Sequence, residues 1–403
     1  MPRELEHYLD YLAGCRFCPM CKPASEVGNL TRLESHTTRY RAVLLWRFLR
    51  HGRPLGSRER ELIYQSTLDS ISQSWCVNGY PVSEYVLAAR RMLFLAGELP
   101  DPVRGALRRP EPMERAGAFR PDAVFLASEI TENGAWELLE AGLQALDAIG
   151  LSVLPLPAES GALPYCLGDW EQAAAQGRRV VEAVKESGAC WIIVDGPQTL
   201  WALRRIYPEM GLALPEGTIV VSLAERLGDA IGAAGSPAAR RAAPGPDTGK
   251  DAPAAERGAP DAPVFFHDSR SALFLGDEPA RPRAIQPGFG GDEAALGRGE
   301  IYDRPRKALA GLGMNAVYSV WSRSLARSCG ADDGLQFTYP GLAAGLARQR
   351  VAEARDAGAR AVVSDSPSCV VHMRRTMMGS PERGDLPIQW LPEILAGRLR
   401  GAR

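Results

Sequence analysis

The sequence lacks the features that mark several large classes of protein. Its apolar runs are much shorter than the about 20 residues that a membrane span needs, and no cleavable leader precedes the first cysteines. The formal net charge is only −1, which gives no support for nucleic-acid binding. Eight cysteines in 403 residues are too few for a disulfide scaffold. We therefore expect a cytoplasmic protein in a reducing compartment.

Three of the cysteines stand two residues apart near the start of the chain, at Cys15, Cys18 and Cys21. This is the spacing of three thiolate ligands of an iron–sulfur cluster. The fourth position of the usual run holds Ser25, and the next cysteine along the chain is Cys76. We predict that Cys76 completes the set and that the four thiolates bind one [4Fe-4S] cluster.

Two alternatives concern this predicted site. Thiolates also bind zinc, so a zinc knuckle is the second interpretation. Zinc sites more often use two paired Cys-x-x-Cys or Cys/His units, and the triple spacing favours iron. The fourth ligand is also open to Tyr80, to His36 or to an iron without a protein ligand.

The pattern of apolar residues predicts an α+β multidomain protein. Residues 1–97 are expected to form a small helical domain around the cysteines, followed by a Pro/Arg-rich linker at 98–121. Alternating strands and helices then predict two α/β lobes with parallel sheets. The first lobe spans 122–229 and the second lobe 264–398, with an Ala/Pro/Gly-rich flexible linker at 230–263.

The two lobes repeat the same order of elements. Their predicted strands are 122–127, 152–155, 190–194, 218–222, 264–266, 315–320, 361–364 and 388–390. In each lobe one strand follows a helix that ends at a glycine, Gly188 or Gly358, which suits a helix C-terminus. The same strand is followed by Asp-x-Pro, where proline can start the next helix. We interpret this as an internal duplication.

Several short segments of the lobes have the form of cysteine motifs. In the second lobe four segments can be compared with a motif, given in brackets: His267-Asp268-Ser269-Arg270 (H-D-P-C), Glu300 to Arg306 (Y-x-x-P-R), Ser328-Cys329-Gly330 (C-C-G) and Ser366-Pro367-Ser368-Cys369 (C-P-x-C). In the first lobe two segments can be compared in the same way: Cys166-Leu167-Gly168-Asp169 (C-C-G-D) and Gly196-Pro197-Gln198-Thr199 (C-P-x-C). On these segments the chain resembles the iron–sulfur subunits with two cysteine-rich CCG domains. That family includes heterodisulfide reductase catalytic subunits and the iron–sulfur subunits of glycolate oxidase and anaerobic glycerol-3-phosphate dehydrogenase. The resemblance implies an N-terminal helical ferredoxin-like domain followed by two pseudo-symmetric α/β lobes.

The chain also departs from the family pattern. Six cysteine positions of the lobes hold other residues, namely Arg270, Ser328, Ser366, Leu167, Gly196 and Thr199. The motifs retain Cys166 in the first lobe and Cys329 and Cys369 in the second. Two thiolates cannot hold a cubane cluster alone, so we expect both lobes to be empty of metal. A redox dithiol of Cys329 and Cys369 is the alternative.

The resemblance implies an electron-transfer subunit of a flavoprotein dehydrogenase complex. Electrons would pass from an FAD-containing dehydrogenase subunit through the one [4Fe-4S] cluster to a quinone-linked or ferredoxin-type carrier, with the degenerate lobes as a docking platform. We assign no catalytic residue to this chain, and Gly288-Phe289-Gly290-Gly291 lacks the strand–turn–helix frame of a dinucleotide site. The alternative is a structural subunit with no working cluster, whose cysteines are remnants or bind zinc.

Overall fold

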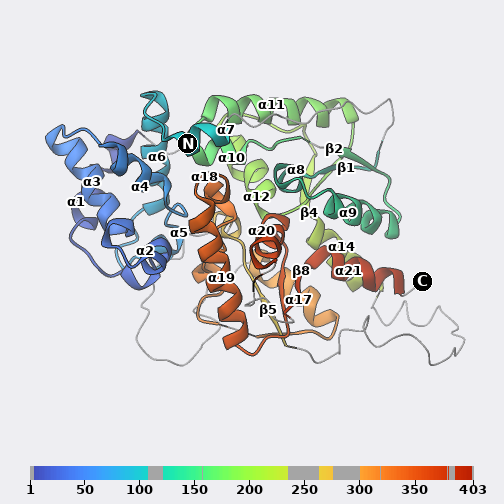
Figure 1. The fold of residues 1–403 in the computed structure, drawn as a ribbon. Coiled ribbons are helices and arrows are strands. Elements are labelled where there is room, and N and C mark those ends of the chain that lie inside the picture. Colours follow the sequence, from blue (N-terminus) through green and yellow to red (C-terminus); the bar gives the residue numbers. More distant parts are fainter. Residues whose placement is uncertain are drawn as a thin grey trace, which may run out of the picture.

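The computed structural model describes residues 4–107, 121–156, 158–234, 263–275, 300–317, 319–378, 380 and 386–401. Most of both predicted linkers and the glycine-rich segment at 288–291 lie outside these residues. Figure 1 shows three parts, with the N-terminal helices on one side and the two lobes stacked beside them. In the described part of the chain, no helix combines the length and the apolar character needed to cross a bilayer.

The N-terminal part is all helical. Its elements are η1 (Leu5–Tyr8), α1 (Leu9–Cys15), η2 (Lys22–Ala24), α2 (Glu26–Thr31), η3 (Glu34–His36), α3 (Thr38–His51), α4 (Ser57–Tyr64), α5 (Ser70–Ser74), α6 (Val82–Leu95) and α7 (Asp101–Leu107). Helix α3 begins where the Thr37 side chain accepts a hydrogen bond from the Tyr40 N–H, and it ends at Gly52, whose φ is 61°. Helix α7 lies inside the predicted linker at 98–121.

Helices α4 and α5 are separated by a break in the backbone between Tyr64 and Ser70. Helix α4 ends at Tyr64, and Leu68 and Asp69 have φ values of 51° and 48°. Such left-handed backbone is rare for residues other than glycine. Here it accompanies a buried ion pair, because Asp69 Oδ2 lies 3.2 Å from Arg41 Nε on α3. A tertiary contact therefore accompanies the break between α4 and α5.

Each lobe contains a four-stranded parallel sheet, and the two sheets have the same strand order. The order is β2-β1-β3-β4 in the first lobe and β6-β5-β7-β8 in the second. The strands are β1 (Ala123–Leu126), β2 (Val153–Leu156), β3 (Trp191–Val194), β4 (Ile219–Ser222), β5 (Pro263–Phe266), β6 (Asn315–Val317), β7 (Ala361–Ser364) and β8 (Ile388–Trp390). All eight predicted strands are confirmed, with ends that differ by up to three residues.

Helices cover both sheets. The first lobe has α8 (Ser128–Asn133), α9 (Trp136–Ala148), α10 (Ala162–Leu167), α11 (Trp170–Ser187), α12 (Pro197–Trp201), the π-helical η4 (Ala202–Ile206), α13 (Tyr207–Glu209) and α14 (Leu223–Ala234). The second has α16 (Arg270–Leu273), α17 (Glu300–Gly311), η6 (Arg323–Leu325), η7 (Asp332–Gly334), α18 (Leu335–Thr338), α19 (Pro340–Asp356), α20 (Pro367–Met377) and α21 (Leu391–Gly401). Helix α9 packs on α21 and α14 packs on α17, which is the exchange of partners that pseudo-two-fold symmetry requires.

A buried arginine connects the helical part to both lobes. Arg90 of α6 is 1% exposed. Its guanidinium donates to the backbone carbonyls of Tyr64 and Ser66 in the helical part, of Cys166 in the first lobe and of Asp333 in the second. An arginine in this position offers five donors in a fixed plane, so one side chain satisfies acceptors from three regions. We infer that the three parts are held together as one unit.

Candidate metal and redox sites

The fold brings the two predicted thiol-bearing segments together. Cys15 is the last residue of α1, Cys18 lies in the following turn and Cys21 directly precedes η2. Cys76 lies in the loop between α5 and α6. Tyr80, at the end of that loop, packs its ring 5.5 Å from the ring of Tyr11 on α1.

The four thiols lie within electrostatic reach of one another. Burial raises the pKa of the Cys15 thiol to about 11, with further contributions from the neighbouring thiols of Cys76 and Cys18. Burial likewise raises the pKa of Cys21 to about 12, and Cys15, Cys76 and Cys18 are again among its neighbours. Without a metal, the thiols of Cys15 and Cys21 are therefore protonated at neutral pH. A bound metal would reverse this, because coordination removes the thiol proton.

The contacts of the thiols and of His36 bear on which residue could be the fourth ligand. Cys76 Sγ accepts the Tyr80 backbone N–H at 3.4 Å, and Cys15 Sγ lies 3.5 Å from Tyr85 Oη. Both ring nitrogens of His36 are already engaged, Nδ1 with Thr31 at 3.2 Å and Nε2 with Gln65 at 3.0 Å. His36 therefore has no free nitrogen to offer a metal.

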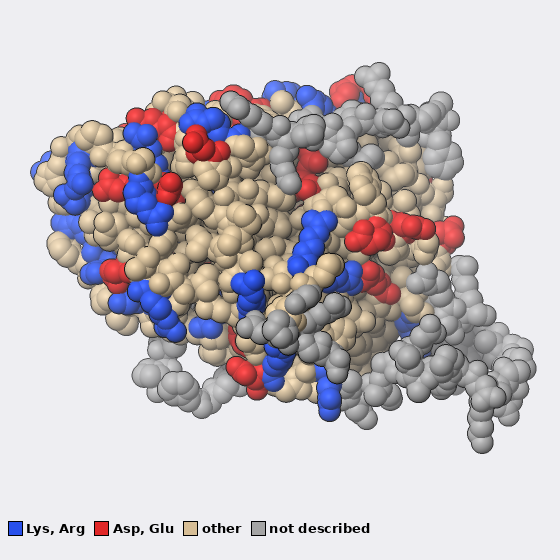
Figure 2. Space-filling view, in the orientation of Figure 1, with Lys and Arg blue, Asp and Glu red and all other residues tan. Residues whose placement is uncertain are grey.

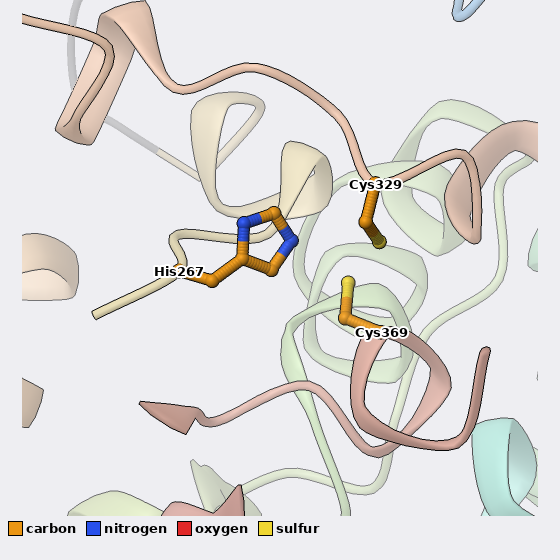
Figure 3. A group of neighbouring side chains, drawn as sticks. All are labelled: His267, Cys329 and Cys369. Carbon is orange, nitrogen blue, oxygen red and sulfur yellow. The ribbon is translucent and has the colours of Figure 1, made fainter. Parts of the chain in front are cut away.

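A second group of donors lies at the switch point of the second sheet. Parallel sheets bind ligands where neighbouring strands send their connections in opposite directions, here between β5 and β7. His267 follows β5, Cys369 is the third residue of α20 after β7, and Cys329 comes from the loop before η7. The ligand atoms of all three lie within 4.8 Å of one another, and all three side chains are buried. Figure 3 shows the two sulfur atoms facing each other with the imidazole beside them.

Arg350 determines what the imidazole can do. The Arg350 Nε–H donates to His267 Nδ1 at 3.0 Å. Nδ1 therefore accepts through its lone pair and carries no proton. In the neutral ring the proton is then on Nε2, which faces the sulfur atoms and has no hydrogen-bond partner. A metal-ligating histidine normally donates its other N–H to an acceptor. The Nε2–H of His267 therefore points toward the sulfur atoms without a hydrogen bond to either, and the burial of the ring beside Arg350 lowers its pKa to about 3.

A buried arginine stands where the H-D-P-C motif compared above has its cysteine. Arg270 is 2% exposed. Its Nη1 lies 3.8 Å from Glu26 of α2 and its Nε 3.9 Å from Asp333. It also donates to the backbone carbonyl of Thr67 in the helical part. A guanidinium has no lone pair to give iron, so this corner of the second lobe is filled by an ion-pair network and does not fit a cubane cluster.

The first lobe has no comparable group at the same positions. Ala127 follows β1 as His267 follows β5, and Thr199 is the third residue of α12 as Cys369 is of α20. The position that corresponds to Cys329 is found from two glycines, Gly161 and Gly330, that pack against equivalent helices. A Cβ at Gly161 would lie 2.5 Å from the carbonyl oxygen of Ala173, and one at Gly330 would lie 2.6 Å from Ala343 Cα. Ala173 and Ala343 are both the fourth residue of their long helices, α11 and α19.

This pairing changes the alignment of the first lobe. The structure matches Gly161 to Gly330, and hence Ser160 to Cys329, whereas the sequence analysis aligned Cys166-Leu167-Gly168 with the C-C-G motif. Cys166 lies in α10 and is fully buried. Cys166 is therefore a core cysteine and not the C-C-G cysteine predicted from the sequence, because no local pattern identifies the glycine that packs against the long helix.

Sequence reasoning also passed over His267 as a partner of the two sulfurs. A signal was available, because His267 directly follows the predicted strand at 264–266, at the end where parallel sheets carry their sites. The approach of Cys329 to Cys369 appeared only as the alternative of a redox dithiol. These two residues are separated by forty positions, and their distance depends on the tertiary fold.

A chain of contacts runs between the two groups. Trp75, next to Cys76, stacks on Trp321 of the second lobe with ring centroids 5.5 Å apart. The Trp321 carbonyl accepts the Arg350 Nη2–H at 2.8 Å, and Arg350 contacts His267 as described. The N-terminal thiols and the thiols of the second lobe are thus linked by packed side chains.

Comparisons with known proteins agree with this architecture. Residues 295–374 match the family described as CCG, a cysteine-rich domain, and this segment contains Cys329 and Cys369. The chain is similar in fold to a solved structure titled "Crystal structure of a hypothetical protein from Helicobacter pylori", with a TM-score of 0.55 and 11% sequence identity over 89% of this chain and 67% of that chain. No curated protein matches the chain. The CCG match is consistent with a metal-binding or iron–sulfur role.

Proposed function

We propose that this chain is an electron-transfer subunit of a flavoprotein dehydrogenase complex that holds one [4Fe-4S] cluster on Cys15, Cys18, Cys21 and Cys76. The observation that carries the proposal is the gathering of these four thiols from two segments that lie 55 residues apart in sequence. The CCG match at residues 295–374 supports an iron–sulfur role for the chain as a whole.

The residues at the N-terminal group fit a cluster better than a single zinc ion. Within the described residues, the only group of three or more Cys, His, Asp or Glu donors whose ligand atoms lie within 4.8 Å of one another is the one at His267. The N-terminal thiols are therefore more widely spaced than four ligands around one ion. A cubane cluster takes each thiolate on a different iron. When bound, it would supply one-electron transfer.

Groups beside the N-terminal thiols would influence the reduction potential of such a cluster. The Tyr80 N–H and the Tyr85 hydroxyl contact the sulfur atoms of Cys76 and Cys15. Hydrogen bonds to cluster sulfurs help to set the reduction potential. Burial of Cys15, which is 6% exposed, limits contact with water on that side.

The lobes serve in this proposal as a platform for the FAD-containing subunit. The ion-pair network of Arg270 and the locked His267 leave the second lobe without the donor set of a cubane, and the first lobe has only Ala127, Ser160 and Thr199 at the matching positions. Their sheets and buried cores are nevertheless complete. A quinone-linked or ferredoxin-type carrier would accept the electrons downstream.

The first test is anaerobic analysis of iron and sulfide in the full chain. We expect about four of each per chain, because one complete set of thiols is present. About one zinc per chain with no iron would support the zinc knuckle and overturn the proposal. About eight irons would mean that a lobe also holds a cluster.

The second test is Cys76→Ser, with Cys190→Ser as the matched control because Cys190 is exposed and off the motifs. Loss of one of four thiolates should abolish or strongly destabilise the cluster. The control should keep full iron content. If Cys76→Ser keeps its iron and an unchanged reduced EPR signal, the fourth ligand is another group, and Tyr80→Phe is the next variant to measure.

A further inference from the structure

We propose that the thiol-bearing loops, together with exposed arginines of α3, form the docking face for an acidic ferredoxin-type electron carrier. The inference rests on the proposed function, because the face matters only if a cluster lies beneath it. We call Phe17, Met20, Val77, Arg47 and Arg50 the loop face.

Large apolar side chains are exposed on both thiol-bearing loops. Phe17 is 73% exposed, Met20 52% and Val77 54%. Phe17 and Val77 each adjoin a candidate ligand in sequence, as does Met20. Apolar groups at such positions let a partner approach the cluster closely without removing charges from water. An exposed apolar patch rimmed by charge is typical of an interaction site.

Arg16 joins these loops to the basic side of α3. Its guanidinium lies between two aromatic rings, 3.9 Å from the centroid of Phe17 and 3.8 Å from that of Trp46. Arg47 follows Trp46, and Arg50 lies one turn further along the same side of the helix. The exposed end of α3 is therefore continuous with the loop that carries Cys15, Cys18 and Cys21.

The positive charge of this face is not neutralised locally. Among the described residues, Arg47 and Arg50 form no ion pair, whereas nearby Lys22 and Arg39 both pair with Glu34. Figure 2 shows lysine and arginine side chains along the outer edge of the helical part, around α1 and α3. Free arginines on a docking face attract a partner of negative charge and raise its association rate.

The composition of the face favours a transient carrier over a permanent subunit. Transient electron-transfer complexes have small interfaces, whereas permanent subunits bury larger and more apolar areas. Three apolar side chains with an arginine rim match the first kind. The FAD-containing subunit would then bind elsewhere, and the carrier would exchange electrons at the loop face.

The test uses the full chain with its cluster, mixed in a stopped-flow instrument with a dithionite-reduced, acidic two-cluster ferredoxin as the probe. We expect Arg47→Glu/Arg50→Glu to lower the second-order rate constant about tenfold or more at low salt. The difference should largely vanish at about 1 M salt, where the screening length is about 3 Å. The matched control is Arg178→Glu/Arg348→Glu, which makes the same charge change at exposed positions of α11 and α19 and should leave the rate unchanged.

A second variant, Phe17→Ser/Met20→Ser, tests the apolar part. Its rate constant should fall at both low and high salt, because apolar contact is not screened. Iron content and direct reduction by dithionite are measured for every variant, so that a damaged cluster is not mistaken for lost docking.

Three results would overturn the inference. An unchanged rate in both loop-face variants with full iron would remove the docking face and leave the proposed function intact. A rate that falls equally in the Arg178→Glu/Arg348→Glu control would mean that overall charge, and not this face, is responsible. Loss of binding to phosphatidylserine vesicles in Arg47→Glu/Arg50→Glu, with the ferredoxin rate unchanged, would assign the arginines to a membrane surface. Absence of iron in the unaltered chain would instead overturn the proposed function.

Discussion

The first and second lobes have the same sheet and different chemistry at the ends of its strands. Both sheets have the same strand order, and both lobes place a glycine of positive φ against the fourth residue of a long helix. Yet Ala127, Ser160 and Thr199 of the first lobe correspond to His267, Cys329 and Cys369 of the second. The two lobes share the backbone features that build the sheet and its glycine contact, while the three side chains at these positions differ. The same lobe fold therefore carries different side chains at the ends of its strands.

A second difference lies at the fourth residue after β1 in the first lobe and after β5 in the second. Ile130 occupies this position in the first lobe and is fully buried among apolar side chains. Arg270 occupies it in the second lobe and joins Glu26 to Asp333. The second lobe is therefore connected to the helical part by charge at a position where the first lobe uses only apolar packing.

The largest expected effect tests this difference. Arg270→Met should lower the free energy of unfolding by about 3–5 kcal/mol, because it leaves the carboxyl groups of Glu26 and Asp333 buried without their cation. Ile130→Met, the matched control in the first lobe, changes shape at nearly constant volume and should cost less than about 1.5 kcal/mol. Denaturant unfolding followed by circular dichroism measures both. Near-equal losses would mean that the ion-pair network does not connect the parts as described.

The next prediction tests the pairing of glycines. Gly161→Ala and Gly330→Ala should each cost about 2–4 kcal/mol, since both add left-handed strain and a collision with the backbone of a long helix. Gly188→Ala and Gly358→Ala are the matched controls. They have positive φ but open space around the added carbon, and should cost only about 1–2 kcal/mol. Thermal unfolding of the four variants measures these losses. If Gly161→Ala lost no more stability than the controls, the equivalence of Gly161 and Gly330 would be wrong.

A pH prediction compares Asp195 with Asp365, the aspartates that follow β3 and β7. Burial raises the pKa of each from 3.8 to about 7. The native state then keeps protons that the unfolded chain releases between about pH 4 and pH 7, so these groups make stability fall as the pH rises through that range. Asp365→Asn should make this decline shallower, and Asp195→Asn should do so by a similar amount.

The measurement is the free energy of unfolding at several pH values in this range. Asp195 also accepts hydrogen bonds from the Ile130 N–H and the Thr199 hydroxyl, so its variant should be less stable at every pH. Only the slope of the unfolding free energy against pH tests whether Asp195 and Asp365 behave alike. A slope unchanged in both variants would mean that neither aspartate holds its proton in the folded protein.

The smallest effect is expected when the second lobe is given the side chains of the first. Cys329→Ser/Cys369→Thr should retain the fold, the iron content and near-normal electron transfer in the reconstituted complex, because His267 is arranged as a hydrogen-bond donor and not as a ligand. Elemental analysis and turnover measure the outcome. Loss of a bound metal, or a large loss of turnover with assembly unharmed, would show that the second lobe has a chemical role that the first lacks.

The sequence by itself determined the strands, the helical character of the N-terminal part and the repeated order of elements in the two lobes. These depend on local signals, namely short apolar runs, helical periodicity, and glycine and Asp-x-Pro at element ends, and such signals act over a few residues. The Cys15–Cys18–Cys21 spacing is local in the same way, so the thiol loop could be identified as a candidate site directly.

Only the tertiary structure decided which distant residues meet. The break after α4 accompanies the contact of Asp69 with Arg41, and the alignment of the first lobe depends on which glycine packs against α11. His267, Cys329 and Cys369 come together because three separate segments end at one switch point of a parallel sheet. Arg350, from yet another helix, then fixes the imidazole as a donor. No local pattern encodes such a set, since each contact depends on the packing of elements far apart in the chain.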